Sequence, residues 1–241
     1  MHRTLNILLW LTIFAVVALN NSVSAKSVQG NGSTGSRSCL SDRALSNAVL
    51  SLSKDYDEAQ NAGRQLRNFS KRSERCRQQV ISAVMKAMDK PNLDITKDHE
   101  SNLIWREGAV LLGDLKARQA LDLLISHITM SDGEWSITMV HQPALDGIIR
   151  MGKLAIPKLR TKLTDPDSHV RQAAVYCLAW IGGPSVRRAF QRALPHEADP
   201  CVKRFIEVSL DTIDTKSGEL KPDRSRWLSA FLCGDVAQTS P

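Results

Sequence analysis

Acidic side chains gather in four loops, residues 89–101, 129–136, 164–168 and 195–200, which separate apolar helical stretches. A row of carboxylates can attract a basic partner or a divalent cation, and single carboxylates can also cap helices. Capping is the alternative for any one of these acids, but the first loop is longer than capping requires. Trp135 is a candidate anchor for a partner, or else packs on a neighbouring helix. The predicted partner-binding residues are Asp94, Asp98, Glu100, Asp132, Glu134, Trp135 and Asp167.

Catalytic chemistry finds no support in the motifs of this chain. It has no Gly-x-Ser-x-Gly nucleophile turn, no His-Glu-x-x-His metal motif and no phosphate-binding glycine loop. Gly182-Gly183-Pro184 lies between two helical stretches and indicates a tight turn. His127, His141, His169 and His196 fall at similar ends of successive units, but none forms a close ligand pair, which favours surface or turn positions. We therefore predict a protein without catalytic activity, metal or cofactor.

Five cysteines give an odd count and contain no Cys-x-x-Cys pair, which argues against zinc and thioredoxin-like sites. Cys177 lies among apolar helix residues and is expected to be a small core side chain. The remaining four can form disulfides in an oxidising compartment, although the sequence does not give their pairing. They are Cys39, Cys76, Cys201 and Cys233.

The first 25 residues have the three-part layout of a secretory signal peptide. A short basic start is followed by an apolar run of 15 residues, Leu5 to Leu19, and then by Val23-Ser24-Ala25. The run is shorter than the roughly 20 residues that a membrane-spanning helix needs, so we expect cleavage after Ala25 and no later membrane contact. The protein would be periplasmic or secreted. The mature chain keeps a net charge of about +6, but export argues against a nucleic-acid partner.

The elements that position these loops follow a helical repeat. Leu112, Ile148, Leu178 and Leu210 are 36, 30 and 32 residues apart, and each follows another aliphatic residue by eight positions. A second series, Leu124, Leu159 and Phe190, keeps steps of 35 and 31. Two series with one period predict stacked helix pairs that bury a continuous core. The expected helices are 103–115, 118–128, 137–151, 155–163, 170–181, 186–194 and 202–213.

Residues 163–174 and 178–182, Leu-Thr-Asp-Pro-Asp-Ser-His-Val-Arg-Gln-Ala-Ala and Leu-Ala-Trp-Ile-Gly, resemble the signature of bacterial HEAT-like repeats. The stretch 105–115 is similar to the same first-helix pattern, and the resemblance spans roughly residues 75–213. It implies a scaffold that binds proteins. It also implies that Asp165 and Arg171 help link successive repeats, whereas His141 and Lys203 depart from the pattern in the neighbouring units. Related repeats also occur in phycobilin lyases and in alkylpurine DNA glycosylases, which gives a lyase-like accessory enzyme and a nucleic-acid binder as alternatives.

The sequence thus predicts an all-α protein, a short right-handed solenoid of about four to five HEAT-like helix pairs. Its expected parts are a signal peptide (1–25), a flexible leader (26–38) and irregular N-terminal helices (39–88), interrupted near Gly63 and residues 68–75. The repeat array (89–213) and a C-terminal capping helix with its tail (214–241) complete the chain. The predicted function is an exported, non-enzymatic scaffold that holds a protein or peptide on its concave face or on its acidic inter-repeat rim.

Overall fold

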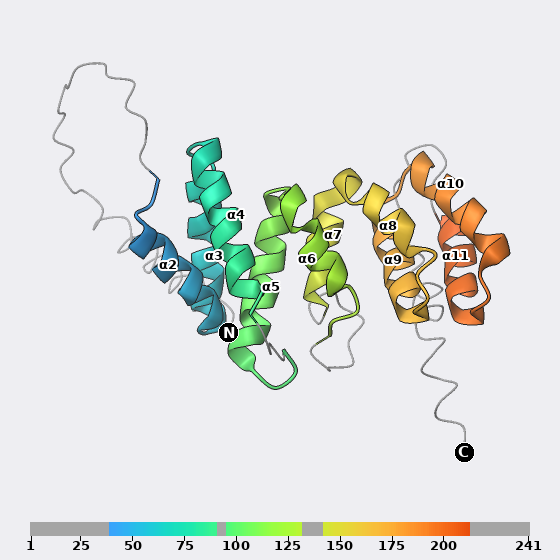
Figure 1. Ribbon diagram of the computed structural model, residues 1–241, viewed down its shortest axis with the longest axis horizontal. Helices are drawn as coiled ribbons and strands as arrows, with labels where there is room; N and C mark the ends of the chain where they lie inside the picture. The colour runs from blue at the N-terminus through green and yellow to red at the C-terminus, as the bar shows by residue number, and fades with distance from the viewer. Residues whose placement is uncertain (1–38, 91–94, 132–141, 213–241) are drawn as a thin grey trace, which may run out of the picture. The chain divides into compact units, whose positions relative to one another are not determined.

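The computed structural model describes residues 39–90, 95–131 and 142–212, and within these ranges the chain is helical and contains no strand (Figure 1). The all-α solenoid is confirmed. The N-terminal helices are α2 (Asp42–Leu50), α3 (Tyr56–Ser70) and α4 (Glu74–Met88). The following helices are α5 (His99–Asp114), α6 (Leu121–Ser126), α7 (Pro143–Met151), α8 (Ile156–Lys162), α9 (Ser168–Ile181), α10 (Pro184–Ala193) and α11 (Pro200–Thr212). Short 3-10 helices are η1 (Ser51–Ser53), η2 (Arg118–Ala120), η4 (Gly152–Leu154) and η5 (Leu194–His196).

The helices begin where a side chain can satisfy free backbone N–H groups or where proline fits the first turn. Ser41, Asp55 and Ser73 cap α2, α3 and α4 by accepting a backbone N–H bond from three residues further on. Pro143 and Pro184 occupy the first turns of α7 and α10, where their missing N–H costs nothing. Gly182 and Gly183 have positive φ angles and make the turn between α9 and α10 that the sequence predicts.

Successive helix pairs stack on one another in the order of the sequence. The first helices form one row in which α3 contacts α5, α5 contacts α7, α7 contacts α9 and α9 contacts α11. The second helices α4, α6, α8 and α10 each contact the first helix of the next pair. The α3 and α4 helices form the pair that precedes the legible repeats, and α2 packs on both of them. The described residues 164–168 and 195–200 therefore connect one helix pair to the next.

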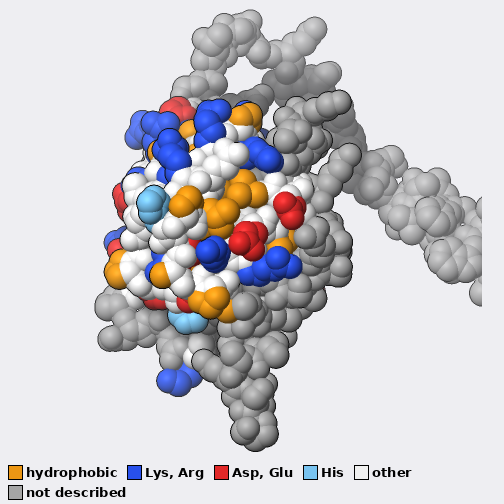
Figure 2. Space-filling view, turned by 90° about the vertical axis from the view of Figure 1, so that its right-hand side faces the viewer, with side chains coloured by type: hydrophobic (Ala, Val, Ile, Leu, Met, Phe, Trp, Pro, Cys, Tyr) orange, Lys and Arg blue, Asp and Glu red, His pale blue; other side chains and the backbone are white. Residues whose placement is uncertain are grey.

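The repeat positions line the core, with one exception. Leu112, Ile148 and Leu178 are fully buried, as predicted. Leu210 is only partly buried and packs at the margin of the core. It lies in α11, the last helix that the structure describes, at the end of the array that faces the viewer in Figure 2. The next pair that would cover it in a repeat array is therefore not among the described residues. The prediction that all four are buried alike is wrong at this position.

The expected helix break at Gly63 is also wrong. Helix α3 continues through Gly63 and ends at Ser70, and the chain turns at Lys71 and Arg72 before Ser73 caps α4. Glycine lowers helix propensity by only about 1 kcal/mol relative to alanine, and tertiary packing outweighs that amount. Here packing against α4 and α5 holds the helix intact.

Two glycines allow α5 and α7 to approach closely. A Cβ atom at Gly113 would lie 2.6 Å from the carbonyl oxygen of Gly147, and one at Gly147 would lie 2.7 Å from the carbonyl oxygen of Ala109. Real Cβ atoms do not come this near to backbone oxygen. The absence of side chains at these two positions therefore sets the spacing of two consecutive first helices.

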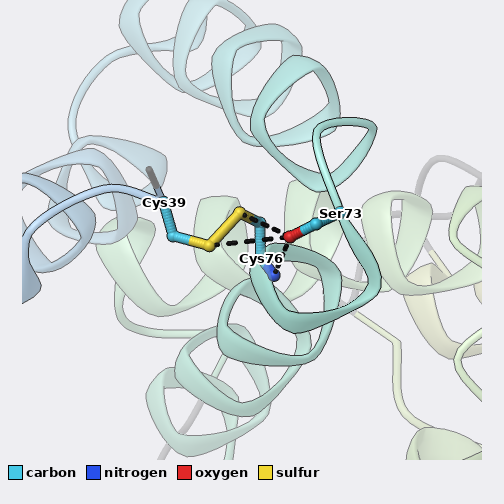
Figure 3. The surroundings of a disulfide bond; sticks show 3 residues. All are labelled: Cys39, Ser73 and Cys76. Atoms are coloured by element: carbon cyan, nitrogen blue, oxygen red, sulfur yellow. Dashed lines mark hydrogen bonds between the residues drawn. A yellow bond between two sulfur atoms is a disulfide. The ribbon is translucent and has the colours of Figure 1, made fainter. Parts of the chain in front are cut away.

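A disulfide joins Cys39 to Cys76 and ties the segment before α2 to the first turn of α4 (Figure 3). The Ser73 hydroxyl accepts the backbone N–H of Cys76 at 3.2 Å and lies 3.1 Å from its sulfur. Cys201 is also disulfide-bonded. Cys177 is a free, fully buried thiol, as expected, and burial raises its pKa.

Residues 1–38 and 213–241 lie outside the described part of the chain, and so do the predicted signal peptide, leader and C-terminal capping helix. Among the described residues, no helix combines the length and the apolar character that crossing a membrane requires.

Candidate partner-binding cleft

The predicted acidic rim is only partly within the described residues. Asp94, Asp132, Glu134 and Trp135 lie outside them. Asp98 and Asp167 are the N-caps of α5 and α9, and their carboxylates accept the backbone N–H groups of Glu100 at 3.1 Å and His169 at 2.8 Å. Asp98 also accepts the Ser101 hydroxyl, a bond that holds the pKa of its carboxyl below the usual value. Glu100 is exposed in the first turn of α5.

The two residues expected to link successive repeats have different partners. The Asp165 carboxylate accepts Lys162 Nζ at 2.8 Å and the backbone N–H of Asp167 at 3.2 Å, and the lysine lowers the pKa of Asp165. Arg171 instead donates to the backbone carbonyls of Asp165 and Pro166 and to both carboxylate oxygens of Glu197, at 2.8 and 2.9 Å. Arg171 therefore links α9 to the segment that precedes α11.

A metal centre finds no support in the part of the chain that the structure describes, where no three His, Cys, Asp or Glu side chains could hold an ion together. His127 hydrogen-bonds the carbonyl of Leu123 at 2.9 Å, and its ring packs against Trp105 with centroids 4.6 Å apart. His169 and His196 are exposed, and His141 lies outside the described residues.

A polar cleft of about 320 Å³ opens on the row of first helices, where α3, α5 and α7 lie side by side. Arginines from all three helices line it, together with one tyrosine and two acids. The lining residues are Tyr56, Gln60, Arg64, Arg67, Arg106, Glu107, Val110, Pro143, Asp146 and Arg150. We call this site the Tyr/Arg cleft.

Ion pairs that run across three helices fix its walls. Asp114, at the end of α5, accepts Arg67 Nε from α3 at 2.8 Å and Arg150 Nη1 from α7 at 3.0 Å. Arg150 also donates through Nε to Asp146, one helical turn earlier, at 2.8 Å. Because the two carboxylates occupy Arg67 and Arg150, these arginines hold the helices together and define the shape of the cleft.

Tyr56, Arg64 and Arg106 line the cleft and take no part in these ion pairs. Tyr56 is 47% exposed, and the guanidinium of Arg106 lies 5.3 Å from the centre of its ring, a cation–π arrangement. Glu107 is half-buried beside them. Burial raises the pKa of the Glu107 carboxyl, although Arg67 and Arg106 oppose the rise. An exposed aromatic ring beside a guanidinium is an arrangement that can bind a partner.

Comparison with known protein families gives one match. Residues 139–211 match the family model of HEAT repeats, over the stretch that contains helices α7 to α11. The match supports a HEAT-repeat protein. No curated protein and no solved structure matches the chain. HEAT repeats form helical scaffolds, often for protein interaction.

The sequence does not reveal the Tyr/Arg cleft, because the residues that line the cleft come from three helices and follow no common spacing. The one local signal is Asp146 and Arg150, an i, i+4 pair of opposite charge on a predicted helix. The acids of the loops are conspicuous because they cluster in the sequence. Of the described ones, Asp98 and Asp167 cap helices, Asp165 and Glu197 pair with Lys162 and Arg171, and Glu100 is exposed.

Proposed function

We propose that this protein is an exported, non-enzymatic HEAT-like scaffold that binds a protein or peptide partner in the Tyr/Arg cleft. The observation that carries the proposal is the exposed Tyr56 ring with Arg106 against it, at the mouth of a cleft made by three helices. Tyrosine and arginine are enriched among the residues that dominate binding energy at protein interfaces.

Rigidity of the walls supports the same proposal. A binding site is more effective when its side chains are held on fixed elements, because less conformational entropy is lost on binding. Asp114 joins α3 to α7 through Arg67 and Arg150, so the three helices hold one geometry before a partner arrives. Binding would then use Tyr56, Arg64 and Arg106, which are not part of this network.

Export is supported by cysteine chemistry and by the N-terminal sequence. The Cys39–Cys76 disulfide is of a kind that persists in secreted and periplasmic proteins and is rare in the cytosol. The apolar run that ends in Val23-Ser24-Ala25 fits a signal peptide cut after Ala25. N-terminal sequencing of the mature protein should begin at Lys26, and an intact Met1 on the mature protein would contradict export by cleavage.

Affinity capture from the native compartment, followed by mass spectrometry, tests the binding proposal. Tyr56→Ala and Arg106→Ala should each reduce capture of the enriched protein at least about tenfold, the effect of losing a hot-spot residue. Leu50→Ala is the matched control, since Leu50 is 57% exposed and does not line the cleft. Equal capture by all three variants would exclude the Tyr/Arg cleft as the binding site.

A further inference from the structure

A second concave surface lies at a boundary between helix pairs, away from the Tyr/Arg cleft. It is a groove of about 510 Å³ formed by the end of α8, the start of α9, α10 and η5. Apolar side chains form its floor, where Leu163 and Ala189 are buried and Ala193 is half-buried. Arg160, Arg192 and His196 are exposed along its border. We call it the boundary groove.

The two acids that line the boundary groove, Asp165 and Glu197, are each already paired with a basic side chain. Asp165 accepts Lys162 Nζ at 2.8 Å, and only 16% of its side chain is exposed. Glu197 receives two bonds from Arg171, and 4% of its side chain is exposed. Neither carboxylate is therefore open to a cation or to a basic partner.

The remaining charge of the groove is positive. Arg160 and Arg192 lie near the ends of the successive second helices α8 and α10, and both line the groove. Within the described ranges, neither guanidinium has a hydrogen-bond or ion-pair partner. An arginine fork donates paired N–H groups and matches a carboxylate in geometry as well as charge. Two such forks beside an apolar floor are complementary to carboxylates that stand next to aliphatic side chains.

We infer that the boundary groove binds an acidic peptide segment of a partner protein, with glutamate or aspartate on Arg160 and Arg192 and an aliphatic side chain on the apolar floor. This partner is opposite in charge to the one that the acidic loops indicate in the sequence. The groove and the Tyr/Arg cleft share no residue, so the inference stands apart from the proposed function and can fail without it.

Fluorescence polarisation with the oxidised mature chain tests the inference. The probe is a fluorescein-labelled peptide of alternating glutamate and leucine, compared with the same peptide carrying glutamine for glutamate. The acidic peptide should bind at least about tenfold more tightly, and its affinity should fall as salt is added, because exposed charges are screened. Equal binding of the two peptides, or no binding of either, overturns the inference.

Charge-matched variants locate the binding. Arg160→Gln with Arg192→Gln should weaken the acidic peptide at least about tenfold, and the fold should be unchanged because both side chains are exposed. The control is Arg188→Gln with Lys203→Gln, which removes the same charge at exposed positions outside the groove. If the control variant weakens peptide binding as much, the affinity depends on the net charge of the protein, and the boundary groove is not the binding site. A single-stranded oligonucleotide that binds as tightly, with the same sensitivity to the two arginines, would also overturn a peptide-specific groove.

Discussion

The guanidinium of Arg171 makes a two-bond ion pair with the carboxylate of Glu197, 26 residues further along the chain. Only 15% and 4% of the two side chains are exposed. The same guanidinium donates to the carbonyls of Asp165 and Pro166 at the entry to α9. Arg171 thus closes the loop before α9 and also joins that loop to the segment before α11. In a helical repeat, the interface between neighbouring pairs contributes much of the stability.

Replacing Arg171 by methionine should destabilise the protein by about 3–5 kcal/mol, because Glu197 would remain buried without a counter-charge. Urea unfolding followed by circular dichroism measures the change. Arg188→Met, at an exposed position of α10, should change the free energy of unfolding by no more than about 0.5 kcal/mol. Equal changes in the free energy of unfolding would show that the bonds of Arg171 stabilise the fold no more than an exposed arginine does.

A methyl group at Gly113 should separate α5 from α7. The added Cβ would lie 2.6 Å from the Gly147 carbonyl oxygen and 2.6 Å from the Arg150 Cβ. Relief of the backbone contact requires a shift of the helix itself, which costs free energy. Gly113→Ala should therefore cost about 1–3 kcal/mol, in the range of overpacked cores. Thermal and urea unfolding would report the loss.

Gly63 is the matched control for that substitution, since it also lies inside a helix and is buried. Its added Cβ would lie 3.5 Å from Glu107 Oε2, an ordinary contact with a side chain. Gly63→Ala should be neutral, or stabilising by up to about 1 kcal/mol through helix propensity. A loss at Gly63 as large as at Gly113 would contradict the close-approach explanation.

Much of the fold was predictable because period and capping are local properties of the sequence. The spacing of Leu112, Ile148 and Leu178 indicated the helix pairs, and most helix limits fall within a few residues of the expected ones. The 3.6-residue period and the repeat length both come from counting, without knowledge of contacts. What differed was decided by tertiary context: α3 continues through Gly63, and Leu210 has no described pair beyond it.

The candidate site was less predictable, because side-chain partners depend on which helices become neighbours. The resemblance implied that Asp165 and Arg171 help link repeats. Arg171 joins the entry of α9 to the segment before α11 through Glu197, whereas the Asp165 carboxylate bonds Lys162, three residues earlier, and neither partner could be read from the resemblance. The capping alternative for the loop acids is what Asp98 and Asp167 show. The Asp114 network spans three helices, and no local pattern encodes it.

Leu178 and Leu210 occupy the same repeat position but differ in burial. Leu178→Ala should cost about 2–5 kcal/mol, because the side chain is fully buried and its removal leaves a cavity. Leu210→Ala should cost clearly less, since solvent already reaches part of that side chain. Equal losses in urea unfolding would mean that α11 is covered in solution as completely as α9.

Reduction of the Cys39–Cys76 disulfide should destabilise the N-terminal helices. The bond spans a sequence separation of 37 residues, and closing a loop of this size stabilises a protein by about 4 kcal/mol in the chain-entropy treatment. Cys39→Ser with Cys76→Ser should therefore lower the free energy of unfolding by about 2–4 kcal/mol. Peptide mapping of the oxidised protein should recover this pair. It should also recover Cys201 joined to Cys233, the cysteine that the other assignments leave.

Glu107 should make the folded state less stable as pH rises. Burial raises the pKa of its carboxyl in the folded protein, so the folded state holds this proton more tightly than the unfolded chain does. Below the ordinary pKa the carboxyl is protonated in both states and has no effect. As pH rises through that value and then through the raised folded pKa, ionisation increasingly favours the unfolded chain.

Glu107→Gln removes that penalty and should stabilise the protein at about pH 7 but not at about pH 3.5, where the native carboxyl is already neutral. Urea unfolding at the two pH values measures the difference. Glu100→Gln is the control, because the Glu100 side chain is exposed and has no burial penalty to remove. If the Glu107→Gln variant is less stable than the original protein at neutral pH, attraction to Arg67 and Arg106 outweighs burial, and Glu107 is then part of the ion-pair network that shapes the cleft.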